Sequence, residues 1–245
     1  MESGQPPHFI WNREGEKYWR FAEGERLELW SENGRLACTP GFEEYVHGFL
    51  RLGDDLPAIH RAISTDERMA CAVKHCGGLR ITKSDPWEAL VCFVCSQNNN
   101  IPRIRKMVQS LMRDGEVMTP EEMARADLSA SRLGYREKFL RGCAAMAPSY
   151  DFDALARMPY ADAHAAIIEF PGVGPKVADC TLLFGLGFLE AFPVDVWVSR
   201  VMGALYGAKD TRDARRIAEK KWGAYAGYAQ QYLFCFGRDG ACPMG

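Results

Sequence analysis

One short segment constrains the fold of this chain more than any other. Its sequence is Pro171-Gly172-Val173-Gly174, and it separates a helical run over 161–170 from a second run that begins near Pro175. Proline ends a helix but suits the first turn of the next one, and glycine permits a tight reversal. The segment therefore predicts two helices joined by a hairpin whose backbone can approach another surface closely.

The backbone amides of Gly172, Val173 and Gly174 are candidates for phosphate contacts, because amides at the start of a helix donate readily to anions. The formal net charge of −2 rules out binding driven by overall charge. Local surpluses are present, with nine basic against six acidic residues over 101–145 and seven against three over 196–221. The alternative interpretation of the hairpin is an ordinary connector between two helices with glycine caps. The alternative interpretation of the local charge surpluses is chance variation on solvent-exposed faces.

The composition is that of a globular protein without a membrane span. Of the 245 residues, 47% are hydrophobic and 25% are charged, and no apolar run approaches the length of a membrane helix. The first residues lack the basic and apolar segments of a secretory signal. We therefore expect a cytoplasmic protein whose nine cysteines are reduced and mostly buried.

The N-terminal part has the pattern of a β-meander. Short apolar clusters, from Phe9-Ile10-Trp11 to Leu36-Ala37-Cys38, are separated by Gly- and Asn-containing turns. Beyond Pro57 the pattern becomes helical. The sequence thus predicts an α+β protein with a small antiparallel β-domain over 1–57 and a helical region over 58–245.

Helix starts are marked by local signals. The segments 64–67 and 119–122 both match the capping box, and Asp85 precedes a helix that is apolar nearly all round. This last pattern predicts a central core helix. Its Cys92 and Cys95 form a C-x-x-C pair, for which packing is favoured over metal or redox chemistry.

Lys176 is a candidate nucleophile. It lies in the first turn of the second hairpin helix, where the helix dipole disfavours an ammonium by up to about 1 kcal/mol and so favours a free amine. Cys180 shares its helical face. Asp195 follows a proline and precedes another helix, as an N-cap residue does. Asp195 lies nineteen residues after Lys176, and the helix between them is long enough for the chain to turn back. This spacing suggests that the lysine and the acid form a catalytic pair.

The segments 171–180 and 193–197, PGVGPKVADC and PVDVW, closely resemble those of lysine-bearing helix-hairpin-helix DNA glycosylases. More specifically, the chain resembles the 8-oxoguanine DNA glycosylases of the eukaryotic type. The resemblance covers nearly the whole chain in register. It extends to the run 95–104, to the loop 133–136, to the helix 225–234 and to the N-terminal Ser3-Gly4-Gln5.

This resemblance implies a bifunctional enzyme of base excision repair, a glycosylase and abasic-site lyase that excises 8-oxoguanine opposite cytosine. Lys176 would attack the sugar carbon C1′ and form a Schiff base, and Asp195 would stabilise the developing positive charge. The displaced base would lie against Phe234, Gln230 and Cys180.

Two further sets of contacts follow from the same resemblance. The carbonyl of Gly4 would accept from the N7 hydrogen that distinguishes the oxidised base. Asn98, Arg103 and Arg136 would contact the unpaired cytosine, with Tyr135 wedged into the stack. Trp197 departs from the family, many of whose members carry histidine at this position, so the resemblance does not imply a phosphate contact there.

No cofactor and no metal are implied, and the partner is double-stranded DNA that contains oxidised guanine. The protein would act as a monomer, in the nucleoid of a prokaryote or in a nucleus.

One alternative function is that of a related glycosylase for another damaged base. Only Cys235 and Cys242 follow Asp195, too few for an iron–sulfur loop of four cysteines. The other alternative is a non-catalytic DNA-binding module.

Overall fold

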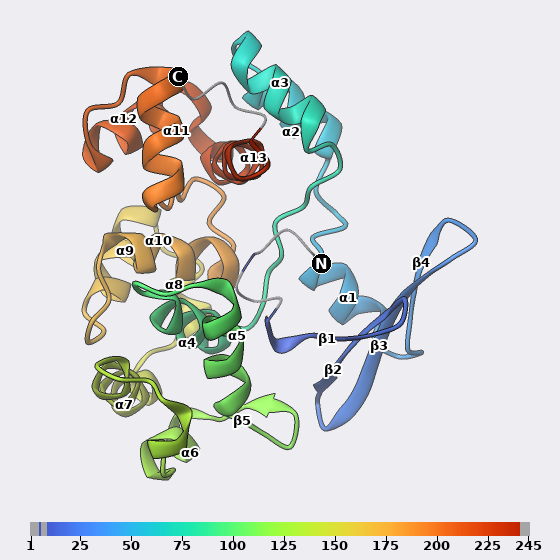
Figure 1. Cartoon of the computed structure of the whole chain (residues 1–245), viewed down its shortest axis with the longest axis vertical. Coiled ribbons are helices and arrows are strands. Elements are labelled where there is room, and N and C mark those ends of the chain that lie inside the picture. The colour runs from blue at the N-terminus through green and yellow to red at the C-terminus, as the bar shows by residue number, and fades with distance from the viewer. Residues whose placement is uncertain (1–4, 6–8, 241–245) are drawn as a thin grey trace.

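The computed structural model describes Gln5 and residues 9–240. A small antiparallel sheet lies at one side of a larger helical body (Figure 1). This arrangement confirms the predicted α+β class. None of the helices in the described ranges is long and apolar enough to span a bilayer.

The sheet is a meander of four strands in the order β1-β2-β3-β4, each antiparallel to its neighbour. The strands are β1 Asn12–Glu14, β2 Lys17–Ala22, β3 Glu25–Glu32 and β4 Arg35–Cys38. At the turn Asn33-Gly34 both residues have positive φ, 51° and 73°, as a two-residue hairpin loop requires. The predicted meander is confirmed, although the cluster 9–11 precedes β1 rather than forming it.

Helix α1, Glu43–Phe49, covers the inner face of the sheet. Phe42, Val46 and Phe49 pack there with Trp11 and Leu27 in a hydrophobic cluster of their own. The next helix, α2, already belongs to the larger helical core. The predicted division at residue 57 falls within α2 and stays a prediction.

The helical body has one continuous hydrophobic core. Its helices are α2 Leu56–Ile63, α3 Glu67–His75, α4 Pro86–Ser96, α5 Ile101–Ser110, α6 Pro120–Arg125, α7 Arg136–Met146, α8 Phe152–Leu155, α9 Tyr160–Ile168, α10 Pro175–Thr181, α11 Val196–Tyr206, α12 Thr211–Trp222 and α13 Ala226–Arg238. A small hairpin of β5, Met112–Arg113, and β6, Glu116–Val117, lies near the sheet. Helices α2, α3 and α11–α13 form one end of the body in Figure 1, and α4–α7 form the other.

Local signals correctly predicted the starts of α4, α6, α10 and α11. Asp85 caps α4 by accepting from the amides of Trp87 and Glu88, and Thr119 forms the complete capping box of α6. The capping box over 64–67 is wrong. Ser64 is the C-cap of α2, and Asp66 caps α3 by accepting from the amide of Met69. Helix α2 runs on to Ile63, so the chain needs residues 64–66 to turn before α3 begins.

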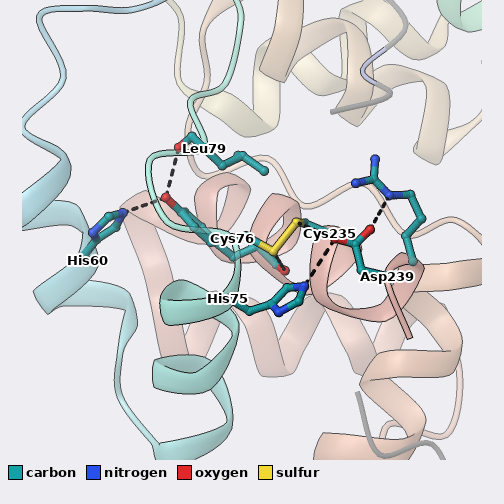
Figure 2. The surroundings of a disulfide bond; sticks show 8 residues. His60, His75, Cys76, Leu79, Cys235 and Asp239 are labelled. Atoms are coloured by element: carbon teal, nitrogen blue, oxygen red, sulfur yellow. Dashed lines mark hydrogen bonds and ion pairs between the residues drawn. A yellow bond between two sulfur atoms is a disulfide. The ribbon is translucent and has the colours of Figure 1, made fainter. Parts of the chain in front are cut away.

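The cysteines follow the expectation only in part. Cys92 and Cys95 are buried in α4, as packing predicts, and burial raises the pKa of Cys95 to about 12. The expectation of reduced thiols throughout is wrong for Cys76 and Cys235, which form a disulfide (Figure 2). Helix α3 packs along α13, which brings the two Cα atoms to 6.4 Å although 159 residues separate them.

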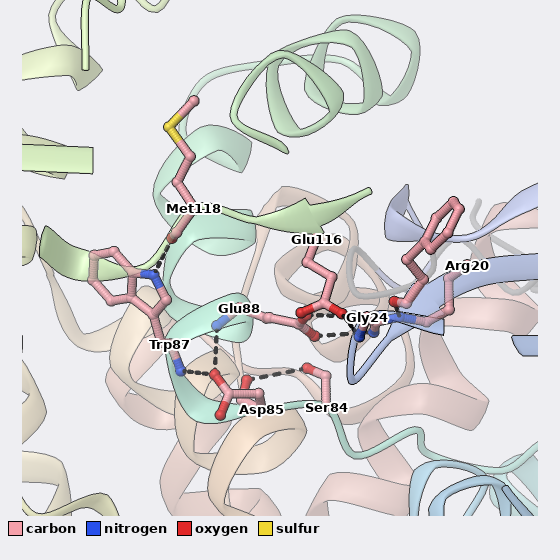
Figure 3. Close-up of polar contacts among 9 residues, drawn as sticks. Arg20, Gly24, Ser84, Asp85, Trp87, Glu88, Glu116 and Met118 are labelled. Atoms are coloured by element: carbon pink, nitrogen blue, oxygen red, sulfur yellow. Dashed lines mark hydrogen bonds and ion pairs between the residues drawn. The ribbon is translucent and has the colours of Figure 1, made fainter. Parts of the chain in front are cut away.

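A buried ion pair joins the sheet to the helical body. Arg20 of β2 donates to both carboxylate oxygens of Glu88 on α4, at 2.5 and 3.1 Å (Figure 3). Burial alone would lower the pKa of Arg20, but the Glu88 carboxylate raises it above the usual value. Nearby, the Gly24 amide donates to Glu116 at 2.9 Å. These polar contacts join the sheet to α4 and to strand β6.

Replacing Arg20 with alanine should lower the free energy of unfolding by about 3–5 kcal/mol, because Glu88 would lose its ion-pair partner in a buried site. Urea unfolding measures this change. Lys17→Ala removes an exposed ion pair with Glu28 and should have little effect. Equal losses in the two variants would contradict the importance of the buried pair.

Candidate active site

The predicted hairpin is present between α9 and α10. Gly172 has φ of +77°, and a Cβ atom there would lie 2.3 Å from the ring of Phe139. The amide of Gln97 donates to the Gly172 carbonyl at 2.7 Å, while Val173 is buried below the turn. Gly174 precedes Pro175, the first residue of α10. Only glycine therefore fits the close approach between this turn and α7.

Lys176 lies in the first turn of α10 and is half-buried against α4. Its Nζ is 3.5 Å from Ser96 Oγ and 5.2 Å from the centre of the Phe93 ring. The Ser96 hydroxyl donates to the Phe93 carbonyl at 2.8 Å, so Ser96 receives the lysine N–H as an acceptor. The amine is thus held at the end of the core helix. Ser96 was not predicted as a site residue; the signal for it in the sequence was its position just before the Asn-rich run.

Asp195 is the N-cap of α11, as predicted. Its Oδ1 accepts from the Val198 amide at 2.8 Å. Within the described part of the chain, its Oδ2 has no hydrogen-bond partner. One carboxylate oxygen therefore fixes the helix end, and the other is available to a ligand.

Lys176 and Asp195 line the same cavity, whose volume is about 1010 Å³. Four more of the predicted residues line it as well: Cys180, Gln230, Phe234 and Asn98. These six residues come from positions 98 to 234. Tertiary structure therefore unites a site that the sequence could only suggest in separate parts.

Two residues of α13 form part of the cavity wall. Gln230 is buried, donates to the Pro193 carbonyl at 3.0 Å and accepts from Gln231 at 2.5 Å. Phe234, one turn further along the helix, is half-buried and packs against the main core. The four-residue spacing predicted that both would reach one cavity, and they do.

Cys180 is buried beside the lysine. Burial raises the pKa of its thiol to about 11, although the neighbouring Lys176 opposes that shift. The thiol is accordingly neutral at physiological pH and adds no negative charge near the amine.

The residues expected to face the opposite base lie at the end of α4 and on nearby elements. Asn98 has φ of +44° and donates to the Tyr135 hydroxyl at 3.3 Å. Arg136 is buried, and its guanidinium donates to the carbonyls of Gln97 and Asn98 at 3.0 and 3.1 Å. Arg103 is exposed on α5. Of these four residues only Asn98 lines the cavity.

Gly4 and Trp197 are the remaining positions that the sequence singled out. Gly4 lies outside the described residues, whereas the adjacent Gln5 lines the cavity and was missed as a candidate. Trp197 is exposed at the cavity and stacks with Arg200, whose guanidinium carbon is 5.6 Å from the ring centre. Across residues 5 and 9–240 no group of three or more His, Cys, Asp or Glu side chains could hold a metal ion.

A family model described as "HhH-GPD superfamily base excision DNA repair protein" matches residues 91–225. The chain belongs to the HhH-GPD superfamily. A second model, the N-terminal domain of 8-oxoguanine DNA glycosylase, matches residues 1–90. Together the two matches confirm the resemblance that the sequence motifs suggested.

Two similar curated proteins are named as N-glycosylases and DNA lyases. The "N-glycosylase/DNA lyase OGG1" of Arabidopsis thaliana is 34% identical over 69% of this chain and 54% of its own length. The "Probable N-glycosylase/DNA lyase" of Methanothermobacter thermautotrophicus is 29% identical over 69% of this chain and 66% of its own. The chain thus spans between half and two thirds of the length of these two curated relatives.

Solved structures of this superfamily have the same fold over almost the whole chain. MBOgg1 in complex with a low-affinity DNA ligand has a TM-score of 0.89, 31% identity, and coverage of 98% of this chain and 91% of its own. The Clostridium acetobutylicum 8-oxoguanine glycosylase/lyase, in complex with double-stranded DNA containing cytosine opposite to 8-oxoG, has a TM-score of 0.87 and 27% identity. Its match covers 96% of this chain and 89% of its own.

The raised pKa of Cys180 predicts that this thiol resists alkylation in the folded protein at about pH 8, because only the thiolate reacts. Its modification should increase as the pH rises toward about 11, where the thiolate forms. Mass spectrometry of iodoacetamide-treated protein measures this. The exposed Cys71 is the internal control and should be modified at about pH 8. Equal modification of the two cysteines at that pH would contradict a neutral, buried Cys180.

Proposed function

We propose that this protein is a bifunctional DNA glycosylase and abasic-site lyase that excises 8-oxoguanine in base excision repair. The observation that carries this proposal is the single cavity lined by Lys176, Asp195, Gln230 and Phe234. It combines an amine, a carboxylate with one free oxygen and an aromatic wall. The relatives named N-glycosylase/DNA lyase support the same activity.

The chemistry begins at the Lys176 amine. After the damaged nucleotide has left the duplex, the nitrogen attacks C1′ and the bond from C1′ to the base breaks. The base leaves with the electrons of that bond and takes up a proton. The C1′–O4′ bond then breaks, O4′ takes up a proton and stays on C4′, and C1′ forms a Schiff base with the lysine nitrogen. Removal of a C2′ proton breaks the C3′–O3′ bond, and the 3′ phosphate leaves with the electrons of that bond by β-elimination. Asp195 stabilises the positive charge that develops on the sugar.

The displaced base occupies the part of the cavity next to α13. Phe234 stacks on its face, and Gln230 bonds to its Watson–Crick edge. Cys180, neutral because burial raises its pKa, packs beside the base without repelling it. The Gly4 carbonyl accepts from N7–H of the oxidised base, which unmodified guanine lacks.

The remaining contacts are made to the duplex. Gly172, Val173 and Gly174 donate backbone amides to a phosphate. For Val173 this requires its amide to leave the Phe170 carbonyl, to which it donates at 3.0 Å. Asn98, Arg103 and Arg136 recognise the unpaired cytosine, and Tyr135 fills the space in the stack. For Arg136 this requires its guanidinium to exchange backbone carbonyls for the base. The protein acts as a monomer without a metal or cofactor, in the cellular compartment that holds the DNA, the nucleoid or the nucleus.

Replacement of Lys176 with glutamine should abolish the covalent adduct that borohydride traps on duplex DNA containing 8-oxoguanine. Trapping requires a Schiff base, and glutamine has no nucleophilic amine. Denaturing gel electrophoresis detects the adduct. Lys138→Gln, a lysine that does not line the cavity, is the matched control and should trap as well as the wild type. An adduct that persists in Lys176→Gln would refute the assigned nucleophile.

Wild-type protein should excise 8-oxoguanine fastest opposite cytosine, because amide and guanidinium donors match the acceptor groups of that base. Single-turnover excision from duplexes that carry each of the four opposite bases measures this preference. Asn98→Ala should reduce the preference for cytosine by about tenfold, the value of one or two hydrogen bonds. Equal rates opposite all four bases in the wild type would contradict the assignment of Asn98, Arg103 and Arg136.

A further inference from the structure

Gln5 is a buried polar residue in the wall of the proposed active-site cavity. Its side chain is only 2% exposed, yet it lines the cavity together with Gln230, Gln231 and Phe234. A buried amide is costly unless its donors and acceptor are bonded. Its partners therefore indicate what this residue does for the site.

The Gln5 amide bonds to a segment far away in the sequence. Its Nε2 donates to the Arg80 carbonyl at 3.1 Å. Its Oε1 accepts both from the Thr82 amide at 3.0 Å and from the Thr82 hydroxyl at 2.9 Å. Because the oxygen meets two donors and the nitrogen meets an acceptor, the amide has one favourable orientation. These bonds attach Gln5 to residues 80–82.

The segment that Gln5 holds is also bonded to α13. The Tyr232 hydroxyl donates to the Leu79 carbonyl at 3.0 Å. The Arg80 guanidinium contacts the carbonyl of Asp54 at 3.3 Å, and the Asp54 carboxylate accepts from Tyr228 at 2.6 Å. Tyr228 and Tyr232 lie on the same helix as Gln230 and Phe234. Gln5 is thus connected, through Leu79 and Arg80, to the helix that forms the proposed base-binding wall.

The groups proposed to act on the sugar are held by other contacts. Lys176 is held by Ser96 and Phe93 of α4, and Asp195 is held by the Val198 amide of its own helix. Neither set of contacts includes Gln5 or residues 79–82. Loss of the Gln5 bonds should therefore leave the amine and the carboxylate in place.

We propose that Gln5 is a positioning residue for recognition of the damaged base, because it fixes the N-terminal wall of the cavity against residues 80–82 and α13. This inference rests on the proposed function and deepens it. It assigns to Gln5 the step in which the displaced base is received, and not the lysine chemistry on the sugar. Removing its bonds should impair excision of the base and spare strand cleavage at a site that has no base.

The test compares two duplexes under single-turnover conditions, one with 8-oxoguanine opposite cytosine and one with a preformed abasic site. Gln5→Glu keeps the shape of the side chain and still accepts from Thr82, but it places an oxygen against the Arg80 carbonyl. We expect excision of the base to fall by roughly 10- to 100-fold, as misplaced binding groups do. Strand cleavage at the abasic site should stay within about twofold of the wild type, because Lys176 remains in position.

Thr82→Val provides a second, milder variant. It removes only the hydroxyl bond to Gln5 and should reduce excision several-fold, again without loss of abasic-site cleavage. The matched control is Trp87→Phe, which also loses one buried bond to a carbonyl, that of Met118 at 2.8 Å, but does not line the cavity. Its ratio of the two activities should equal that of the wild type. Thermal melting of all variants identifies any that fail to fold.

Equal losses on the two substrates in both Gln5→Glu and Thr82→Val, with wild-type activity intact, would refute the inference and reduce Gln5 to a structural residue. Unchanged excision in both variants would refute it as well. If the wild-type protein did not excise 8-oxoguanine at all, the proposed function would be wrong, and the inference would fail with it. The wild-type measurement therefore distinguishes these failures.

Discussion

Helix α4 has almost no surface of its own, because nine of its eleven residues are buried. A helix of this kind is stable only when other elements cover all of its faces, since its apolar side chains must leave water. Helices α5, α7 and α10 pack against it. Its one buried charge, Glu88, is paired with Arg20 of the sheet, which attaches the β-domain to the same helix.

The proposed site depends on this arrangement. The packing of α10 on α4 brings the Lys176 amine to Ser96 and to the Phe93 ring. The end of α4 leads directly into Asn98, and Arg136 binds the carbonyls that this end presents. The opposite wall comes from α11 and α13, so the cavity lies between elements that are distant in sequence. In the proposed mechanism one wall supplies the nucleophile and the other holds the base.

Much of the local structure was predictable from the sequence. The hairpin glycines, the Asp85 and Asp195 caps and the strand turns depend on a few adjacent residues, and each was found where expected. Two predictions were wrong, one because two local signals compete and one because the residues involved are far apart in the sequence. The capping-box pattern at 64–67 lost to the end of α2. The Cys76–Cys235 bond depends on the packing of α3 along α13, which cysteine spacing alone does not reveal.

The sequence by itself determined the helix-hairpin-helix segment, the meander and the positions of Lys176 and Asp195 at helix starts, because backbone preferences and motif spacing act over short stretches of chain. Only the tertiary structure decided that Lys176, Asp195 and Phe234 share one cavity and that Ser96 and Gln5 belong to it. Hydrogen bonds such as those between Gln5 and residues 80–82 join positions about 75 residues apart. Such contacts depend on the packing of elements that are distant in sequence, and no local pattern in the chain encodes them.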